Sequence, residues 1–237
     1  PDRLACAQSA WQVVFVPRKD IDMHDPVYEE AYHGHTIKIF HDPDPESPRE
    51  WSNLGTLICW HRRYRLGESH HFASPESFLR DLAGVSDQCD LSMDQLRERA
   101  ERKAILLPVF LYDHSGLAMN TIGFHCPWDS GQAGYVYVLL EAVRKEFDVK
   151  RVTKALREKA ADILRAEIVS YDAYLGGRVY GYVIERDGEE LDACWGFFGD
   201  YELDCLSEAR AFVDHLVLQA RSRAVAAEEL GASPPPS

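Results

Sequence analysis

Apolar and polar residues alternate in short blocks through the middle of the chain, and residues 105–139 show this pattern most clearly. Three runs rich in Val, Ile, Tyr and Phe are separated there by two loops, 113–116 and 126–131. Apolar runs bounded by Gly, Pro, Asp and Ser are typical of β-strands, and a four-residue connection that ends in Gly is typical of a hairpin. The pattern therefore predicts a β-meander over residues 105–139, which the rest of the chain must cover.

Further strands are predicted on both sides of the meander. Residues 35–41 and 54–61 are expected to pair around the intervening loop, whose three prolines and several acids disfavour regular pairing within the loop itself. Residues 179–185 and 191–198 alternate around Asp187-Gly188, which is the strongest short hairpin signal in the chain. Trp11–Val16 is predicted as one more strand.

Helices are predicted from capping residues and from apolar positions that recur about every 3.6 residues. Ser74 or Ser77 is a candidate N-cap for a short helix that ends at Gly84, and Ser92 is a candidate N-cap for a second. Gly176-Gly177 is expected to end a third, longer helix. The four predicted helices span about residues 75–82, 93–103, 151–175 and 203–229.

Strands in adjacent hairpins with helices at intervals indicate an α+β fold. We expect an antiparallel sheet, made of the meander and the hairpins, that is covered by two to four helices. A glycine-rich phosphate loop is absent from the sequence, so a parallel nucleotide-binding sheet is not expected. The predicted domain organisation is an N-terminal extension over residues 1–34, a single domain over residues 35–229 and a disordered tail over residues 230–237.

The net charge of the chain indicates which kinds of macromolecule it can bind. The formal net charge is −13, from 26 Lys and Arg against 39 Asp and Glu. A negative field disfavours nonspecific binding to nucleic acid or to anionic membranes and favours a basic protein partner. No apolar run approaches the roughly 20 residues that cross a bilayer, so we expect no membrane span.

The cysteine pattern indicates a reducing compartment. Six cysteines are scattered without a Cys-x-x-Cys spacing, which in a chain of this size favours free thiols in a cytosol over a disulfide framework or a zinc ribbon. We therefore predict no intramolecular disulfide and a cytoplasmic location. Cys59 and Cys194 lie within apolar strand-like runs and are expected to be small buried side chains.

The ten histidines do not form a recognisable metal motif. The closest pairs, His33 with His35 and His70 with His71, lack the helical i, i+4 spacing of a His-Glu-x-x-His site. On a strand, His33 and His35 would share a face, but two histidines alone are more often surface residues than ligands. We therefore predict no metal site and no cofactor.

A hydrolase would take Ser115 or Ser130 as nucleophile with His114 as base, or Cys126 with His125. Neighbours in sequence rarely supply such a pair, because nucleophile and base converge from different elements. If residues 117–124 form one strand, its two loops lie roughly 26 Å apart, which excludes a triad that uses both. The sequence therefore assigns no catalytic residue.

The loop that contains Trp128 has more polar and aromatic residues than a turn requires. Asp129 and Gly131 satisfy turn chemistry, which leaves Trp128 and Gln132 unexplained. A large aromatic beside an acid, Ser130 and an amide is typical of a recognition surface. We name Trp128, Asp129, Ser130 and Gln132 as candidate binding residues; the alternative for Trp128 is a lid folded back on the core.

Arg62 and Arg63 directly follow a predicted buried strand, so at least one of them is expected to emerge at the end of the sheet. Their guanidinium groups could bind a phosphate or carboxylate in bidentate fashion, which makes them candidate binding residues. They could also pair with the acidic loop over residues 42–50, an option that needs no ligand and that we favour.

Seven motifs, taken together, resemble a family of uncharacterised proteins encoded by bacteriophages and related mobile elements. The match runs from about residue 35 to about residue 217, and residues 1–34 lie outside it. The resemblance implies a phage-borne accessory protein that acts in a bacterial cytosol, and it implies no activity, cofactor or catalytic residue. The motifs are PESPREWSNLGT, HRRYRLGE, YDHSG, PWDSGQAGYVYV, YDAYL, VYGYVI and CWGFFGD.

Three hypotheses about function follow from these observations. The first is a non-enzymatic accessory protein that binds a host or phage macromolecule, for example as an antagonist of host defence, with a basic protein as the favoured partner. The second is a small hydrolase or nucleotide-processing enzyme that uses His, Asp or Arg residues of the loops. The third is a structural phage component, which would form a stable homo-oligomer. The lack of a coherent catalytic set favours the first.

Overall fold

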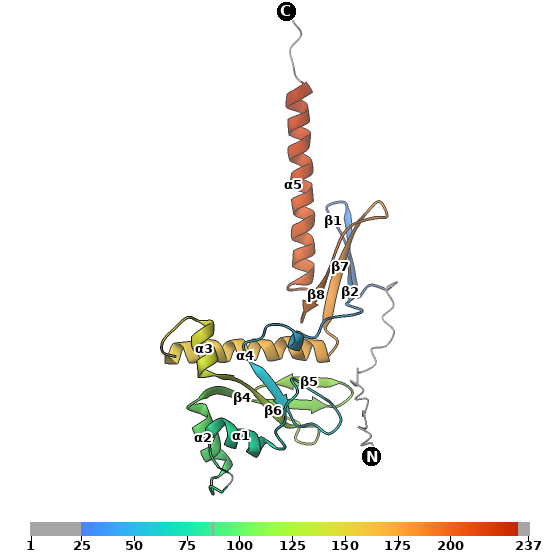
Figure 1. The fold of residues 1–237 in the computed structure, drawn as a ribbon. Helices are drawn as coiled ribbons and strands as arrows, with labels where there is room; N and C mark the ends of the chain where they lie inside the picture. Colours follow the sequence, from blue (N-terminus) through green and yellow to red (C-terminus); the bar gives the residue numbers. More distant parts are fainter. Residues whose placement is uncertain (1–24, 87, 232–237) are drawn as a thin grey trace, which may run out of the picture. The chain divides into compact units, whose positions relative to one another are not determined.

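The computed structural model describes residues 25–86 and 88–231, which form helices and two antiparallel four-stranded sheets (Figure 1). The α+β class predicted from the sequence is confirmed, although the strands form two sheets rather than one. The described chain divides into two compact units. The first unit comprises residues 53–111 and 121–164, and the second comprises residues 25–52, 112–120 and 165–231. The predicted strand Trp11–Val16 and most of the predicted tail lie outside the described residues.

The first sheet belongs to the second unit and has the strand order β1-β2-β7-β8. The hairpin predicted around Asp187-Gly188 is confirmed: both residues have positive φ, 53° and 84°, as a two-residue hairpin turn requires. The strands are β1 (Tyr28–Tyr32), β2 (His35–His41), β7 (Val179–Arg186) and β8 (Glu189–Phe198).

The hairpin of β1 and β2 is a feature that the sequence did not reveal. His33 and Gly34 form its turn with positive φ values of 49° and 77°, and the strands pair from Tyr32↔His35 to Tyr28↔Ile39. The boundary that we predict after residue 34 therefore falls within this turn. His33 and His35 do not share a strand face, because His33 lies in the turn itself.

The predicted pairing of residues 35–41 with residues 54–61 is wrong. β2 has β1 on one side and β7 on the other, so both of its edges are occupied. The loop that follows β2 instead forms a short 3-10 helix, η1 (Pro48–Glu50), which is capped by the Ser47 side chain. Leu57 and its neighbours then form a strand of the other sheet.

One helix, α5 (Cys205–Gly231), covers the first sheet with its N-terminal half (Figure 1). Apolar side chains of β2 and β7 pack there against one side of the helix, as the apolar spacing predicts. Ala209 and Val213 are fully buried, whereas Phe212 and Leu216 are half-buried. The core consists of Ile37, Ile39, Tyr182, Ile184, Cys205, Leu206, Ala209 and Val213.

The second sheet has the strand order β3-β6-β4-β5, which differs from a simple meander. In the predicted meander, the third strand would pair with the second. In the structure the third strand, β6, instead lies beside the first, β4. β5 has only four residues, and the long loop after it brings the chain back to the other side of β4. The strands are β3 (Thr56–Cys59), β4 (Ala104–Asp113), β5 (Leu117–Asn120) and β6 (Ser130–Leu139).

Two short helices confirm the predictions from capping residues. α1 (Pro75–Ala83) begins with a reciprocal capping box between Ser74 and Ser77 and ends at Gly84 in the left-handed conformation. α2 (Met93–Glu101) begins with the same motif between Ser92 and Gln95. Both helices pack on the first unit's core, which consists of Ile58, Phe78, Leu79, Leu82, Leu96, Ala100, Ala104, Leu106 and Tyr135.

The two remaining helices show what apolar spacing does and does not reveal. α4 (Lys154–Leu175) is confirmed and ends at Gly176-Gly177, but Val169, an apolar residue of this helix, is 66% exposed. α3 (Leu140–Glu146) is not predicted, because it continues directly from β6 without a side-chain cap. It brings the number of α-helices in the described part of the chain to five.

Candidate functional site

The connection between β5 and β6, residues 121–129, is called here the Trp128 loop. It carries two large apolar side chains on its surface: Trp128 is 92% exposed and Ile122 is 87% exposed. An exposed side chain of this size contributes nothing to the core, so the interpretation of Trp128 as a core lid is wrong. The geometry agrees with the alternative, a contact residue.

Two local hydrogen bonds close the end of the Trp128 loop, and one of them joins it to the start of β6. The Ser130 hydroxyl donates to the Cys126 carbonyl oxygen at 2.5 Å, and the Cys126 thiol lies 3.5 Å from the Asp129 carboxylate. Both interactions close the turn beneath Trp128. Asp129 and Ser130, predicted as binding residues, are thus engaged within the turn that carries Trp128.

Gln132 is the other residue that turn chemistry leaves unexplained, and it is exposed on β6. Its side-chain nitrogen donates to the carbonyl oxygen of Gly134 at 3.2 Å. A hydrogen bond two residues along the same strand fixes the direction of the amide at low cost. Gln132 therefore presents an oriented polar group four residues after Trp128.

Gly134 holds β6 close to β3. A Cβ atom at this position would lie 2.0 Å from the carbonyl oxygen of Ile58 and 2.9 Å from the Cα of Cys59. Only glycine permits this approach. The strand that follows the Trp128 loop is thereby fixed to the rest of the sheet.

Arg62 and Arg63 are both exposed after β3, as the sequence predicts. The guanidinium of Arg63 lies 5.6 Å from the ring centroid of Tyr64, and that ring stacks on His61 with centroids 5.0 Å apart. Both arginines belong to the first unit, whereas the acidic loop 42–50 belongs to the second. Their pairing with that loop stays a prediction.

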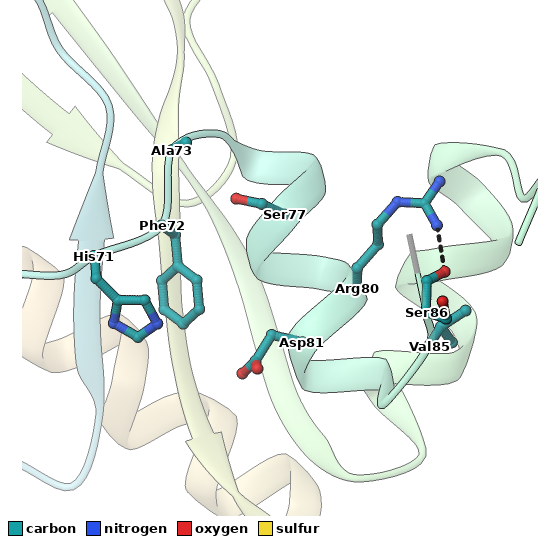
Figure 2. A pocket seen from close by; sticks show the side chains of 8 residues that line it. All are labelled: His71, Phe72, Ala73, Ser77, Arg80, Asp81, Val85 and Ser86. Atoms are coloured by element: carbon teal, nitrogen blue, oxygen red, sulfur yellow. Dashed lines mark hydrogen bonds between the residues drawn. The ribbon is translucent and has the colours of Figure 1, made fainter. Parts of the chain in front are cut away.

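A shallow hollow of about 520 Å³ opens beside α1 (Figure 2). Two of its polar side chains are used by the fold: Ser77 caps α1, and Arg80 donates to Glu76 and to the carbonyl oxygens of Ser86 and Cys89. In Figure 2, Arg80 extends toward Ser86, away from His71. His71 and Asp81 also line the hollow, but the Ser77 hydroxyl donates to the Ser74 carbonyl oxygen at 2.8 Å and is engaged in the helix cap.

The candidate catalytic pairs gain no support from the described residues. Ser130 is engaged with Cys126, and His114 belongs to the other unit. The strand of eight residues that we used to separate the two loops is wrong, because β5 spans Leu117–Asn120 only. Within the described ranges no group of three or more His, Cys, Asp or Glu residues is placed to hold a metal ion.

Ile122 is the surface residue that the sequence analysis missed. It sits in an apolar run that reads as strand through residue 124, so it was expected within the sheet. The available signal is Asn120 and Gly123, two turn-forming residues that flank it. Gly123 has a φ of 88°, which ends regular strand geometry there.

The five described cysteines are free thiols, and Cys6 lies outside the described residues. Cys59 is half-buried, but the expectation that Cys194 is buried is wrong. Cys194 is exposed on β8, an edge strand of its sheet. Cys205 is the buried thiol, and burial raises its pKa to about 12.

Comparison of the chain with known protein families, with curated proteins and with solved structures found no match in any of the three. None of the helices within the described residues is both long and apolar enough to span a bilayer. The functional assignment therefore depends on the geometry of this chain.

Proposed function

We propose that the protein is a non-enzymatic binding protein of the phage accessory type that its motifs resemble. Its partner is a protein with a basic surface, and the Trp128 loop is the main contact. The observation that carries this proposal is the exposure of Trp128, 92%, on a loop that is held by hydrogen bonds at its base.

The physical argument begins with the cost of exposing an indole. A tryptophan buries on the order of 200 Å² when it is covered, and each Å² of apolar surface removed from water contributes roughly 25 cal/mol. Trp128 and Ile122 obtain little of this within the described fold. A partner with an apolar pocket would recover it, and Trp is among the residues that most often dominate binding energy.

The rigidity of the loop base supports the same proposal. Binding that orders a mobile loop costs free energy, whereas a preorganised loop avoids most of that cost. The bond from Ser130 to Cys126 closes the turn, and the bond from Gln132 to Gly134 orients the Gln132 amide on β6 before any partner arrives.

Charge supports a basic partner. The net charge of −13 repels nucleic acid and anionic surfaces and attracts cationic ones. For a phage-type accessory protein, a host protein met in the bacterial cytosol fits this description, and antagonism of a host-defence protein is one form of the proposal.

A pull-down from bacterial lysate at low salt tests the proposal. We expect wild-type protein to retain a defined partner and Trp128→Ala to lose it. The matched control is Trp51→Ala, because Trp51 is also exposed, 43%, but belongs to the second unit, where its ring contacts Phe198. Equal retention by wild type and Trp128→Ala, or no retention by wild type, would count against the proposal.

A further inference from the structure

A second hollow, of about 480 Å³, lies in the second unit where α5 passes the turn of the β1–β2 hairpin and the end of β7. The register Thr36↔Glu185 places His35 and Arg186 at the same end of the sheet. α5 continues beyond this end (Figure 1) and contributes Arg221 and Arg223 to the hollow. Cationic or protonatable side chains therefore converge there from three elements.

The charge of this hollow is opposite to that of the chain. Its lining contains three arginines and two histidines but no Asp or Glu. Arg186 has an acidic neighbour, Asp187, at 3.7 Å, and His33 lies 3.6 Å from Asp214. The positive character of the hollow thus depends mainly on the two arginines of α5.

Arg221 and Arg223 are not explained by helix stability. An acid three or four residues away would pair with an arginine on a helix, but the residues at those positions are Val, Leu, Gln and Ala. Both side chains are exposed, and neither has an ion pair among the described residues. Two uncompensated guanidiniums on one helix are available to an anionic ligand.

The rest of the lining is apolar apart from Gln219, whose amide contacts His215. Leu216 and Val217 are half-buried on α5, and Leu191 is 45% exposed on β8. The ring of buried His35 is fixed by a hydrogen bond from Nδ1 to the His33 carbonyl oxygen at 3.0 Å. A volume of this size falls in the range of small-ligand sites, roughly 300–1,000 Å³.

We infer that the hollow formed by the β1–β2 turn, Arg186 and the arginines of α5 binds a small ligand with several phosphate groups, of the nucleoside triphosphate class. Guanidinium groups bind phosphate oxygens in bidentate fashion. A triphosphate offers several negative charges within the span of three arginines, and the apolar lining is suited to the face of a base. This site is separate from the Trp128 loop and does not depend on the proposed function.

Isothermal titration calorimetry at low salt tests this inference with ATP and with inorganic tripolyphosphate as the probes. We compare wild type with Arg221→Gln/Arg223→Gln and with Arg99→Gln/Arg102→Gln. The second double variant removes the same charge from exposed positions at the end of α2, where Arg102, the C-cap, pairs with Glu98. Thermal melts of both variants establish that they are folded, as their exposure predicts.

The expected result is saturable binding by wild type, with ATP tighter than tripolyphosphate. Loss of charged hydrogen bonds should weaken binding roughly tenfold or more in Arg221→Gln/Arg223→Gln and leave it unchanged in the α2 control. Equal weakening in both double variants would show a general charge effect and overturn the site. The absence of binding at millimolar ATP would also overturn the site. Tripolyphosphate binding as tightly as ATP would overturn the nucleoside part of the inference.

Discussion

Gly134→Ala tests whether the close approach of β3 and β6 holds the sheet that follows the Trp128 loop. The added Cβ would lie 2.0 Å from a backbone oxygen, whereas ordinary contacts between nonbonded atoms lie near 3.5–4.0 Å. The nearest atoms, the Ile58 carbonyl oxygen and the Cys59 Cα, belong to the backbone of β3 and cannot rotate away as a flexible side chain would. β3 and β6 must therefore move apart at Gly134. They pair over only four residue pairs, Thr56↔Tyr137 to Cys59↔Gly134, so this movement disturbs one end of a short ladder.

The size of the effect follows from this geometry. Overpacking of a core typically costs about 1–3 kcal/mol, and a clash with backbone places Gly134→Ala at or above the upper end of that range. The hydrogen bond from the Trp60 amide to the Ala133 carbonyl, 2.8 Å, would also be weakened. At roughly 2–4 °C per kcal/mol for a protein of this length, we expect the Tm to fall by about 6–12 °C.

The matched control is Gly131→Ala on the same strand. Nothing lies within 4 Å of a Cβ built at Gly131, and its backbone is not in the left-handed region. Removing a glycine there should leave stability unchanged or raise it by about 0.4–1 kcal/mol. Thermal melts followed by circular dichroism compare the three proteins. A Tm for Gly134→Ala within about 2 °C of wild type would refute the reasoning about strand contact.

Two further predictions concern ionisation and thiol chemistry. The guanidinium of Arg210 donates two hydrogen bonds of 2.7 Å to Glu30 and lowers the pKa of that carboxyl below its ordinary 4.5. The pair therefore contributes stability above about pH 4.5 that is lost as the pH falls through the lower folded pKa. Melts from pH 7 to pH 3 should show a smaller acid loss for Glu30→Gln than for wild type, with exposed Glu29→Gln unchanged; equal slopes in all three would contradict this. Among the described thiols, Cys89 and Cys194 should react first with a thiol reagent and Cys205 last, and non-reducing mass spectrometry should find none of the five bridged. Fast labelling of Cys205 in the folded protein would be inconsistent with its burial.

Local signals account for the parts of the fold that the sequence predicts well. Asp187-Gly188 favours a two-residue turn through positive φ at both positions, and Ser74 and Ser92 start helices because their hydroxyls accept hydrogen bonds from the first turn. These devices act within a few residues. They need no information about the rest of the chain.

Partners distant in sequence account for the errors. The apolar pattern of β2 would be the same beside β1, β7 or β3. The pattern therefore cannot tell which of these strands pairs with β2. Cys194 lies within an apolar run, yet its exposure follows from the edge position of β8, which only the sheet order reveals.

The candidate site was predicted in part. The composition of residues 126–132 singled out Trp128 and Gln132, but whether an indole faces solvent or core depends on the space beneath it. The short β5, and with it the exposure of Ile122, could not be read from an apolar run that continues through Phe124.

The central claim is that Trp128 serves binding and not stability, and the most direct measurement combines two readings on Trp128→Ala. We predict a Tm within about 2 °C of wild type, as expected for an exposed residue, together with loss of the partner that wild type retains. Gln132→Ala should behave in the same way, with weaker partner binding and an unchanged Tm. The contradictory result is a Tm drop that corresponds to the roughly 3–5 kcal/mol of a truncated buried aromatic, with partner binding by Gln132→Ala unchanged.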